Sequence, residues 1–397
     1  ISPALRWRRV ASSPASLVAA SCTPIVGLTL ADALRPSMSD LFADLTIRET
    51  TVPNRVMVSP MCQYSCAGDG LATDWHQQHL GSRAVGGAGI VMTEATAVSP
   101  AGRISTDDLG IWSDAHVDAL APVAAFIAGQ GSVPAIQLAH AGHKGSKTPP
   151  WDGSTPVQPD GDGWVAPSPS AEAYPYDDDK AVATMTTEEV EGLVEDFRAA
   201  AERALDAGFE IAEVHAAHGY LLHEFLSPVT NRRDDRYGGD FEARTRVVRE
   251  VTAAVREVWP DENPVFVRVS ATDWLPDRES WTVDDTARLA GDLADEGADL
   301  VDVSAGGLHP DQQVPNSGPG YQVPYAERVN EATEALVGAV GGITTPEQAD
   351  ELIRNERADL AIVGREHLRD PYFTLHAAEE LGREDEAEWP IQYRRAV

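Results

Sequence analysis

The chain has 397 residues, enough for one large domain or two of ordinary size, and 43% of them are hydrophobic, so a substantial core is expected. Asp and Glu number 63 against 31 Lys and Arg, and the resulting net charge of −32 argues against a partner that is a nucleic acid or a membrane, and favours a protein of a high-salt cytoplasm. Three cysteines are too few for a disulfide framework, and the chain has no apolar run long enough to span a membrane.

Residues 1–37 differ in character from the rest, because they carry four arginines against one aspartate. One interpretation is a signal peptide, although its apolar run near residues 17–20 is short and Pro24 breaks it. We prefer an extension that lies upstream of a start at Met38. Residues 1–37 are therefore expected to be non-native or disordered, and residues 38–397 to form the functional domain.

From Arg55 onward, short apolar runs alternate with longer amphipathic stretches, the pattern of a parallel sheet with outer helices. The predicted strands are 55–60, 89–97, 133–138, 210–215, 264–270, 300–304, 338–341 and 359–364. The predicted helices are 74–85, 114–130, 187–207, 241–259, 283–296, 325–336, 346–354 and 373–381. Eight such units predict an α/β fold, a single (β/α)₈ TIM barrel.

A long insertion, residues 141–185, separates the third predicted strand from the third helix and is rich in Pro, Gly and Asp. Because it follows the carboxyl end of a strand, it is expected to lie over the catalytic face as a lid or rim. It contains every lysine of the chain: Lys144, Lys147 and Lys180. A phosphosugar aldolase would need a lysine at a strand end, so that class is set aside.

Barrel enzymes gather their chemistry at the carboxyl ends of the strands. The last two predicted strands end in Gly341–Gly342 and Gly364–Arg365, the usual phosphate position of the fold. Glycines let backbone N–H groups approach an anion, and an arginine can clamp it. The sequence therefore predicts one phosphate group at this place.

Arg268 stands inside the otherwise apolar strand 264–270, where an unpaired charge would be very costly. One interpretation is a salt bridge to a neighbouring carboxylate. The other is a fixed cation beside an electron-rich heteroaromatic ring. Gln137 would then offer its amide to the same ring, such as the pyrimidine of a flavin.

His215, His218 and Tyr220 follow the strand 210–215 and allow three interpretations. The histidines could be core residues satisfied by the backbone. They could ligate a metal, for which only Glu94 stands at a strand end as a third ligand. We favour two hydrogen-bond donors to one carbonyl oxygen, with Tyr220 as proton donor.

Cys62 follows Pro60 and Met61 at the end of the first strand. A reactive thiol is one interpretation, but no base is adjacent in sequence, so covalent catalysis is unsupported. A thiol near a cofactor would instead tune the electronics of that cofactor.

These residues resemble the old yellow enzyme family, in its thermophilic-like branch. The resemblance runs from about Leu41 to the C-terminus, and His-x-x-His-Gly-Tyr together with Asn-x-Arg-x-Asp-x-Tyr-Gly-Gly is highly specific. The matching segments are residues 59–64, 137–142, 215–221, 224–228, 231–239, 266–270 and 363–365.

The resemblance implies FMN bound at the barrel mouth and hydride transfer from NADPH or NADH through FMN to the β-carbon of an activated alkene, such as an enone, enal, nitroalkene or maleimide. It implies that His215 and His218 hold the substrate oxygen, that Tyr220 protonates the α-carbon, that Cys62 modulates the flavin and that Tyr64 helps to bind substrate. No metal is implied. The implied flavin-binding residues are Ser59, Pro60, Met61, Cys62, Ala95, Gln137, Arg268, Gly341, Gly342, Gly364 and Arg365.

Two departures from the family pattern stand out. His143 occupies the place of the usual arginine, which puts one loop contact in doubt. The C-terminal residues 392–395 fit an arginine finger, in which Arg395 would enter the site of a neighbouring subunit, but the usual aromatic companion is absent. A homodimer or homotetramer is therefore expected.

Two rival functions can be weighed on the sequence. A dienoyl-CoA-reductase-like relative would carry a cysteine cluster for iron–sulfur beyond the barrel, and no cysteine follows Cys66. The other is an FMN-binding barrel that acts as a sensor or store. Tyr220 argues against it, since a binding protein needs no placed proton donor.

Overall fold

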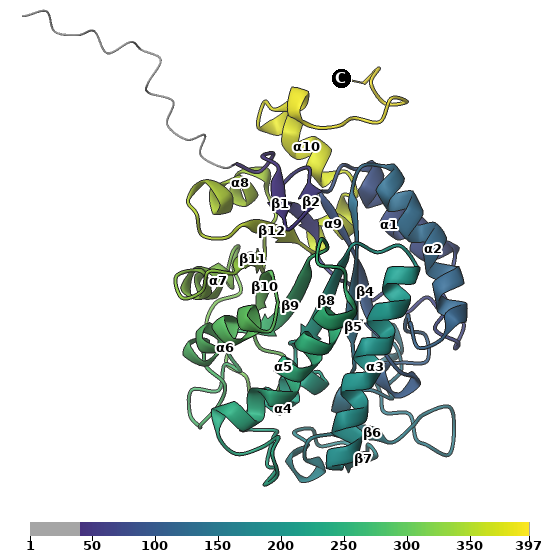
Figure 1. Ribbon diagram of the computed structural model, residues 1–397, viewed down its shortest axis with the longest axis vertical. Helices are drawn as coiled ribbons and strands as arrows, with labels where there is room; N and C mark the ends of the chain where they lie inside the picture. The colour runs from purple at the N-terminus through teal and green to yellow at the C-terminus, as the bar shows by residue number, and fades with distance from the viewer. Residues whose placement is uncertain (1–39, 397) are drawn as a thin grey trace, which may run out of the picture. The chain divides into compact units, whose positions relative to one another are not determined.

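The computed structural model describes residues 40–396, which form an eight-stranded parallel barrel ringed by helices (Figure 1). The barrel closes because the last strand pairs with the first. The predicted (β/α)₈ fold is therefore confirmed, whereas the expectation for residues 1–37 lies outside the described residues. The barrel strands are β3 (Val56–Val58), β4 (Ile90–Ala97), β5 (Val133–Ala139), β8 (Ile211–Ala216), β9 (Val265–Ser270), β10 (Leu300–Ser304), β11 (Leu336–Val340) and β12 (Leu360–Val363).

The outer helices begin at side-chain caps that the sequence supplies. Thr186 and Glu189 form a reciprocal capping box at the start of α3, and Gly208 follows its end with φ +89°. Thr345 caps α8 ahead of Pro346. The helices are α1 (Asp74–Val85), α2 (Asp114–Gly129), α3 (Thr187–Asp206), α5 (Phe241–Val258), α6 (Val283–Asp295), α7 (Val323–Asn330), α8 (Pro346–Arg354) and α10 (Phe373–Glu380).

The predicted helix 325–336 was wrong at its C-terminal end, because α7 stops at Asn330 and Leu336 already belongs to β11. Residues 331–335 keep a helical pattern in sequence. However, Leu336 pairs with Leu300 of β10, and this ladder extends the strand toward the chain start. Pairing across the sheet here outweighs the local pattern.

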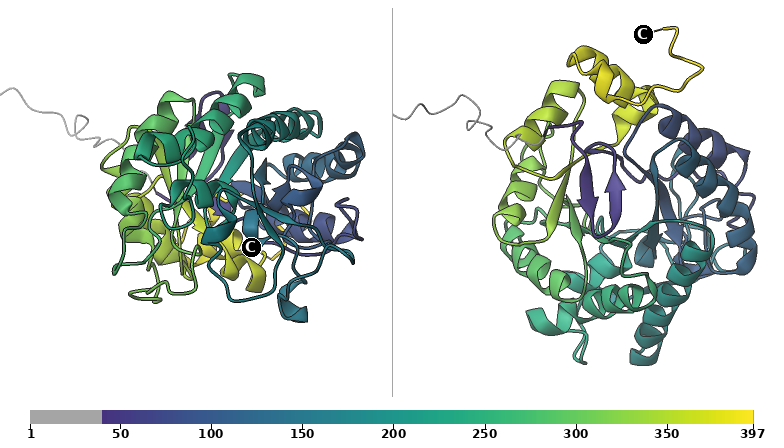
Figure 2. Two further views of the ribbon diagram at one scale, coloured as in Figure 1. Left: turned by 90° about the horizontal axis from the view of Figure 1, so that it is seen from below. Right: turned by 45° about the horizontal axis from the view of Figure 1, so that its top comes forward.

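An antiparallel hairpin, β1 (Leu45–Ile47) and β2 (Thr50–Val52), lies across one end of the barrel (Figure 2). Its buried side chains share one apolar cluster with interior residues of the barrel strands, among them Met57 and Phe266. The sequence did not predict these short strands. They fill the amino-terminal end, so the opposite end is left for the site.

The insertion between β5 and α3 is present as predicted, and it has structure of its own. It contains the parallel pair β6 (Ala166–Ser168) and β7 (Val182–Thr184), and the short helices η2 (Gly142–Lys144), η3 (Pro150–Asp152) and η4 (Ala171–Ala173). Between residues 40 and 396, no helix combines the length and apolar character needed to cross a bilayer.

Candidate active site

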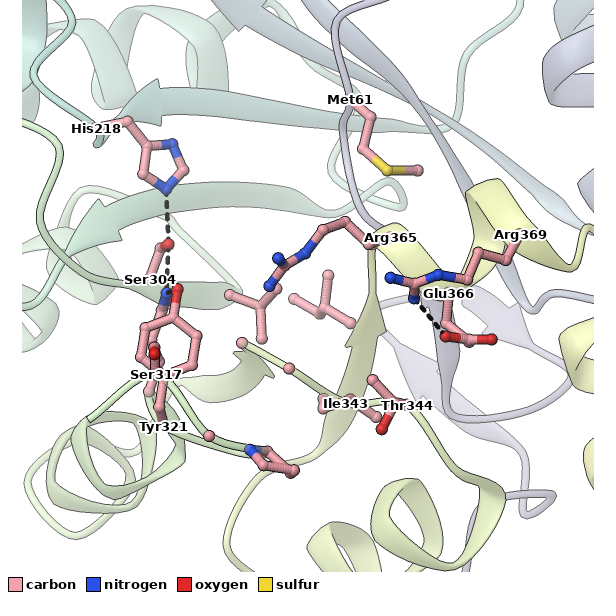
Figure 3. A pocket seen from close by; sticks show the side chains of 18 of the residues that line it. Met61, His218, Ser304, Ser317, Tyr321, Ile343, Thr344, Arg365, Glu366 and Arg369 are labelled. Carbon is pink, nitrogen blue, oxygen red and sulfur yellow. Dashed lines mark hydrogen bonds and ion pairs between the residues drawn. The ribbon is translucent and has the colours of Figure 1, made fainter. Parts of the chain in front are cut away.

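A cavity of about 400 Å³ lies at the carboxyl ends of β11 and β12 (Figure 3). Gly341 and Gly342 line it with φ +117° and +71°, a region that favours glycine. A Cβ on Gly341 would lie 2.8 Å from the side chain of Gln322. Gly364 and Arg365 complete this wall, and the Arg365 guanidinium points into the cavity. This glycine and arginine cradle fits a phosphate group.

Further residues of this wall were not predicted from the sequence. The short helix α9 (Arg365–Arg369) begins directly after Gly364, and Arg369 also lines the cavity. Arg369 stands four residues after Arg365, a helical spacing that could have revealed it. Its Nη1 lies 2.7 Å from Oε2 of Glu366. Tyr321 and Gln322 come from the loop before α7, which carries no recognisable motif in the sequence.

Arg268 confirms the first of its two sequence interpretations, a salt bridge to a neighbouring carboxylate. Its Nε lies 3.0 Å from Oδ2 of Asp302, its partner in the register of β9 and β10. The guanidinium nevertheless lines the cavity, with Nη1 3.4 Å from Oγ of Ser59. Gln137 donates to Oε2 of Glu213 at 3.2 Å. The acids Glu213 and Asp302 were not singled out, although an acid inside an apolar strand is a visible signal.

His215, His218 and Tyr220 gather beside the cavity. The ring centroids lie 5.2 Å apart for the two histidines, and 5.1 Å for His215 and Tyr220. Burial, then the charge of Arg268, lowers the pKa of both histidines well below the usual range, so both rings are neutral at neutral pH. Burial raises the pKa of Tyr220 well above its usual range, so its hydroxyl keeps its proton. Two neutral imidazoles and one phenol can donate hydrogen bonds or a proton.

The hydrogen bonds of His218 define its tautomer. Ser304 donates to Oε1 of Gln322 at 3.0 Å, so Oγ of Ser304 accepts from Nε2 of His218 at 2.6 Å. His218 has φ +60°, and its backbone N–H donates to Oγ of Ser270 at 2.9 Å. Its Nε2–H therefore faces the cavity side (Figure 3).

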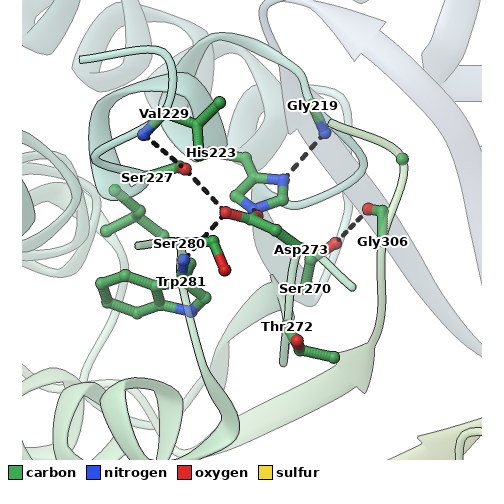
Figure 4. Close-up of polar contacts among 12 residues, drawn as sticks. Gly219, His223, Ser227, Val229, Ser270, Thr272, Asp273, Ser280, Trp281 and Gly306 are labelled. Carbon is green, nitrogen blue, oxygen red and sulfur yellow. Dashed lines mark hydrogen bonds and ion pairs between the residues drawn. The ribbon is translucent and has the colours of Figure 1, made fainter. Parts of the chain in front are cut away.

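A buried carboxylate supports the turn that carries these residues (Figure 4). Nδ1 of His223 accepts from the backbone N–H of Gly219 at 2.9 Å, so its Nε2 donates to Asp273 at 3.0 Å. Asp273 also accepts from Oγ of Ser227 at 2.6 Å and from the backbone N–H of Trp281 at 2.8 Å. These bonds fix the backbone between His218 and Tyr220. Sequence reasoning missed this support.

Glu94, the third ligand considered for a metal, contacts other groups instead. Oε1 of Glu94 lies 3.2 Å from Nε2 of His76, and Oε2 accepts from the backbone N–H of Gln63 at 2.8 Å. Across residues 40–396, no three His, Cys, Asp or Glu side chains are grouped as metal ligands.

Cys62 and Tyr64 lie close enough for each side chain to affect the pKa of the other. Burial, then Asp108 and Glu94, raises the pKa of Cys62 well above its usual range. The thiol is therefore protonated, which suits a hydrogen-bonding role better than a nucleophile. Tyr64 has φ +50° and packs its ring against Trp151 at 5.5 Å.

The other predicted flavin contacts lie at the ends of the first two barrel strands. Ser59 directly follows β3, and its backbone N–H donates to the carbonyl of Val363 at 3.0 Å. Pro60 follows, and Met61 lines the cavity. Ala95 is buried at the point where the register between β4 and β5 shifts.

Lys144, in the insertion, is a site residue that sequence reasoning did not single out. Its Nζ donates to the carbonyl of His218 at 2.6 Å and to the carbonyl of Gly307. Nζ also lies 5.4 Å from the ring centroid of Tyr220. Burial lowers the pKa of Lys144 to about 8. The insertion thus reaches the turn between His218 and Tyr220.

Arg395 is not brought to the site of its own chain. It is exposed in the C-terminal tail, which lies beside α10 (Figure 1). In this tail, Oη of Tyr393 lies 3.4 Å from Oη of Tyr372. A role for Arg395 therefore depends on another subunit.

Comparison with known proteins places this geometry in a family. A profile of the NADH:flavin oxidoreductase / NADH oxidase family matches residues 40–384. The chain belongs to this family. It is 46% identical over 360 residues to the NADPH dehydrogenase of Listeria monocytogenes serovar 1/2a, covering 90% of this chain and 99% of that protein.

Two solved structures share the fold of this flavin oxidoreductase. Morphinone reductase in complex with tetrahydroNAD superposes with a TM-score of 0.71 at 28% identity, covering 87% of this chain and 91% of that one. The old yellow enzyme homologue from Zymomonas mobilis superposes with a TM-score of 0.72 at 25% identity, covering 86% and 93%.

The protein is accordingly an NAD(P)H-dependent FMN oxidoreductase. The residues present fit this cofactor. The backbone at Gly341 and Gly342, with Arg365, suits the phosphate, and Arg268 lines the same cavity where a polar heteroaromatic ring needs a cation. The prediction of NADPH or NADH as hydride donor agrees with the family.

Proposed function

We propose that this flavin oxidoreductase is an ene-reductase, which reduces the C=C bond of an alkene conjugated to a carbonyl or nitro group. The observation that carries the proposal is the grouping of His215, His218 and Tyr220 beside the cavity that fits FMN. FMN supplies the hydride chemistry when bound. The protein supplies the binding of the substrate oxygen and the proton.

The cofactor would be held along the cavity by residues of several strand ends. Gly341, Gly342 and Arg365 would hold the phosphate, while Arg268 and Gln137 would meet the pyrimidine ring. The remaining contacts would come from Ser59, Pro60, Met61, Cys62, Ala95 and Gly364.

Neutral histidines suit the binding of a substrate oxygen. The Nε2–H of His218, which donates to Ser304, would turn to the oxygen of the substrate, and His215 would donate a second bond. Nδ1 of His215 is buried and has no hydrogen-bond partner among the described residues. Two such bonds withdraw electron density from the alkene, which makes its β-carbon electrophilic. Tyr64 would contact the bound substrate.

Tyr220 would deliver the proton to the α-carbon. Its raised pKa keeps the hydroxyl protonated until the substrate accumulates negative charge. The ammonium group of Lys144 at 5.4 Å from the ring would then stabilise the phenolate that remains. Cys62 would tune the cofactor through its thiol.

The proposal is tested by anaerobic single turnover. Holoenzyme is mixed in one step with an enone and with one equivalent of NADPH or NADH deuterated at C4 of its dihydronicotinamide ring, so that label reaching FMN is passed on before it exchanges with solvent. We expect reoxidation of the flavin and a saturated product with deuterium at the β-carbon and a solvent proton at the α-carbon. Reoxidation by oxygen or quinones alone, with the alkene recovered unchanged, would contradict ene-reduction. Bound FMN that nicotinamide cannot reduce would favour a sensor or store.

We further propose that the protein works in a high-salt cytoplasm and belongs to the thermophilic-like branch. A homodimer or homotetramer would let Arg395 of one subunit enter the site of its neighbour. The net charge of −32 supports the high-salt environment, and the exposure of Arg395 supports its contact with a neighbouring subunit.

A further inference from the structure

Two carboxylates and one guanidinium form a buried layer inside the barrel, next to the cavity. Glu213 on β8, Arg268 on β9 and Asp302 on β10 have exposed fractions of 0%, 4% and 0%. Each stands two residues after an apolar side chain of the packed core: Ile211, Phe266 and Leu300. The layer therefore separates this apolar core from the cavity that Arg268 lines.

The hydrogen bonds of this layer are incomplete. Oδ2 of Asp302 lies 3.0 Å from Nε of Arg268, but the two groups are not aligned for a hydrogen bond. Neither carboxylate oxygen of Asp302 has a hydrogen-bond partner among the described residues. Glu213 accepts from the amide of Gln137 through Oε2, while its Oε1 has no hydrogen-bond partner there. A protonated carboxyl would remove one of these uncompensated negative charges.

Charge balance decides which acid carries that proton. One guanidinium can compensate one buried carboxylate, and a second ionised carboxylate would be left unpaired at high cost. Asp302 pairs with Arg268, whereas Glu213 contacts only a neutral amide. Burial and the charge of Asp302 raise the pKa of Glu213 to about 8, while burial raises the pKa of Asp302 to about 6. At neutral pH the layer therefore holds a protonated Glu213, an ionised Asp302 and Arg268.

Other groups near Glu213 do not change this balance. The charged side chains that face it are Asp302 from β10 and Arg268 from β9, and β5 contributes the uncharged Gln137. His215, further along β8, is neutral because burial and Arg268 lower its pKa. The charge of Glu213 can therefore act on the cavity chiefly through Arg268.

We propose that Glu213 holds the proton that keeps this layer neutral at neutral pH. Its ionisation in alkaline solution lowers the reduction potential of FMN in the cavity. Asp302 is a positioning residue for Arg268. The inference rests on the proposed placement of FMN against Arg268. Electrons that the nicotinamide delivers to FMN add negative charge beside Arg268. An ionised Glu213 opposes this charge and takes up one proton from solvent as the electrons arrive, whereas a protonated Glu213 takes up none.

The first test is the reduction potential of the holoenzyme, measured against redox dyes from about pH 6 to about pH 10. The wild type and Glu213→Gln should agree at the acidic end, where both side chains are neutral. Above about pH 8 the wild-type potential should fall below that of the variant, with one additional proton taken up per two electrons. Glu210→Gln, directly before β8, is the matched control and should follow the wild type. Identical curves for the wild type and Glu213→Gln would overturn the proposal.

Infrared difference spectra of the wild type minus Glu213→Gln give a readout that is independent of turnover. At neutral pH we expect the stretching band of a protonated carboxyl group, with or without FMN, and its loss above about pH 8. Asp302→Asn should abolish this band at neutral pH, because Glu213 then becomes the counter-ion of Arg268. A carboxylate signal from wild-type Glu213 at neutral pH would overturn the assignment. The band in a protein that binds no FMN would contradict the proposed function and the effect on the potential, while the assignment of the proton would stand.

Discussion

Tyr220 has a protonated hydroxyl and lies beside His215. Its replacement can therefore distinguish the two half-reactions, reduction of FMN and reduction of the alkene. If Tyr220 is the proton donor, as proposed, Tyr220→Phe should slow reduction of the alkene by about 10²–10⁴-fold. Reduction of FMN by nicotinamide should be nearly unchanged, since that step needs no proton from Tyr220. Stopped-flow absorbance of each half-reaction measures both rates. Equal slowing of both would show that Tyr220 is structural.

Lys144 holds the carbonyl of His218 and faces the ring of Tyr220. Lys144→Met should weaken alkene reduction by roughly tenfold, the effect of losing about 1.5 kcal/mol of hydrogen bonding to a charged group. Lys147→Met, in the same insertion, is the matched control and should leave this rate unchanged. A normal rate in Lys144→Met would remove Lys144 from the mechanism.

The same lysine predicts a dependence of stability on pH. Burial lowers its pKa to about 8, below the ordinary 10.5, so the unfolded chain binds more protons within this window. Stability of the wild type relative to Lys144→Met should therefore rise as the pH increases from about 8 toward about 10. Chemical denaturation of both proteins at several pH values checks the sign, and a relative stability that falls over this range would contradict it.

The insertion and the short helix α4 (Leu221–Leu226) are joined by one fully buried carboxylate. Glu224 accepts from the backbone N–H of His143 at 2.8 Å and from Oγ of Ser168 at 2.7 Å, and its Oε2 lies 2.9 Å from Nδ1 of His143. His143 therefore joins the insertion to α4 through Glu224.

Glu224→Gln should therefore loosen the insertion. Glu224 accepts through both of its oxygens, whereas the amide has only one accepting oxygen, so a loss of about 1–3 kcal/mol in the free energy of unfolding is expected. Limited proteolysis should cut first between residues 141 and 185. Ser168→Ala removes one of the three contacts and should have a smaller effect. Unchanged proteolysis in Glu224→Gln would show that other contacts hold the insertion.

The order of strands and helices could be predicted because each element carries its signal locally, in an apolar run or a cap such as Thr186. The strand-end residues could be predicted with it, because the fold places all strand ends on one face. The strands of the hairpin β1–β2 have only three residues each, too few to show a pattern, and they are held by packing against distant barrel strands. The pair β6–β7 and the early start of β11 at Leu336 depend on pairing with segments further away in the sequence. For the same reason, the sequence did not reveal that Asp302 lies beside Arg268, or that Lys144 reaches His218.

The net charge of −32 belongs to the molecule as a whole. Subunits with this charge repel each other at low ionic strength, whereas at 1 M salt the repulsion is screened within about 3 Å. Assembly and activity should therefore fall together as salt is lowered, if Arg395 completes the site of a neighbour. Sedimentation and turnover across one salt series test this, and a fully active monomer would contradict it.

Deletion of residues 392–397 separates the tail from the general effect of salt. At high salt the truncated protein should keep its FMN and its assembly but use substrate less well. Normal kinetics after the deletion would show that the tail is a frayed end without a role in the site.

The hairpin β1–β2 and the apolar side chains packed behind it give the barrel a closed floor. Any substrate that reacts with a cofactor in the barrel therefore has to enter at the carboxyl ends of the strands. Reduced nicotinamide and the alkene would then compete for the same binding site. Each would bind only after the other had dissociated. Initial rates measured over a grid of both concentrations should give parallel double-reciprocal lines with inhibition at high alkene concentration, whereas intersecting lines would mean that both molecules are accommodated at once.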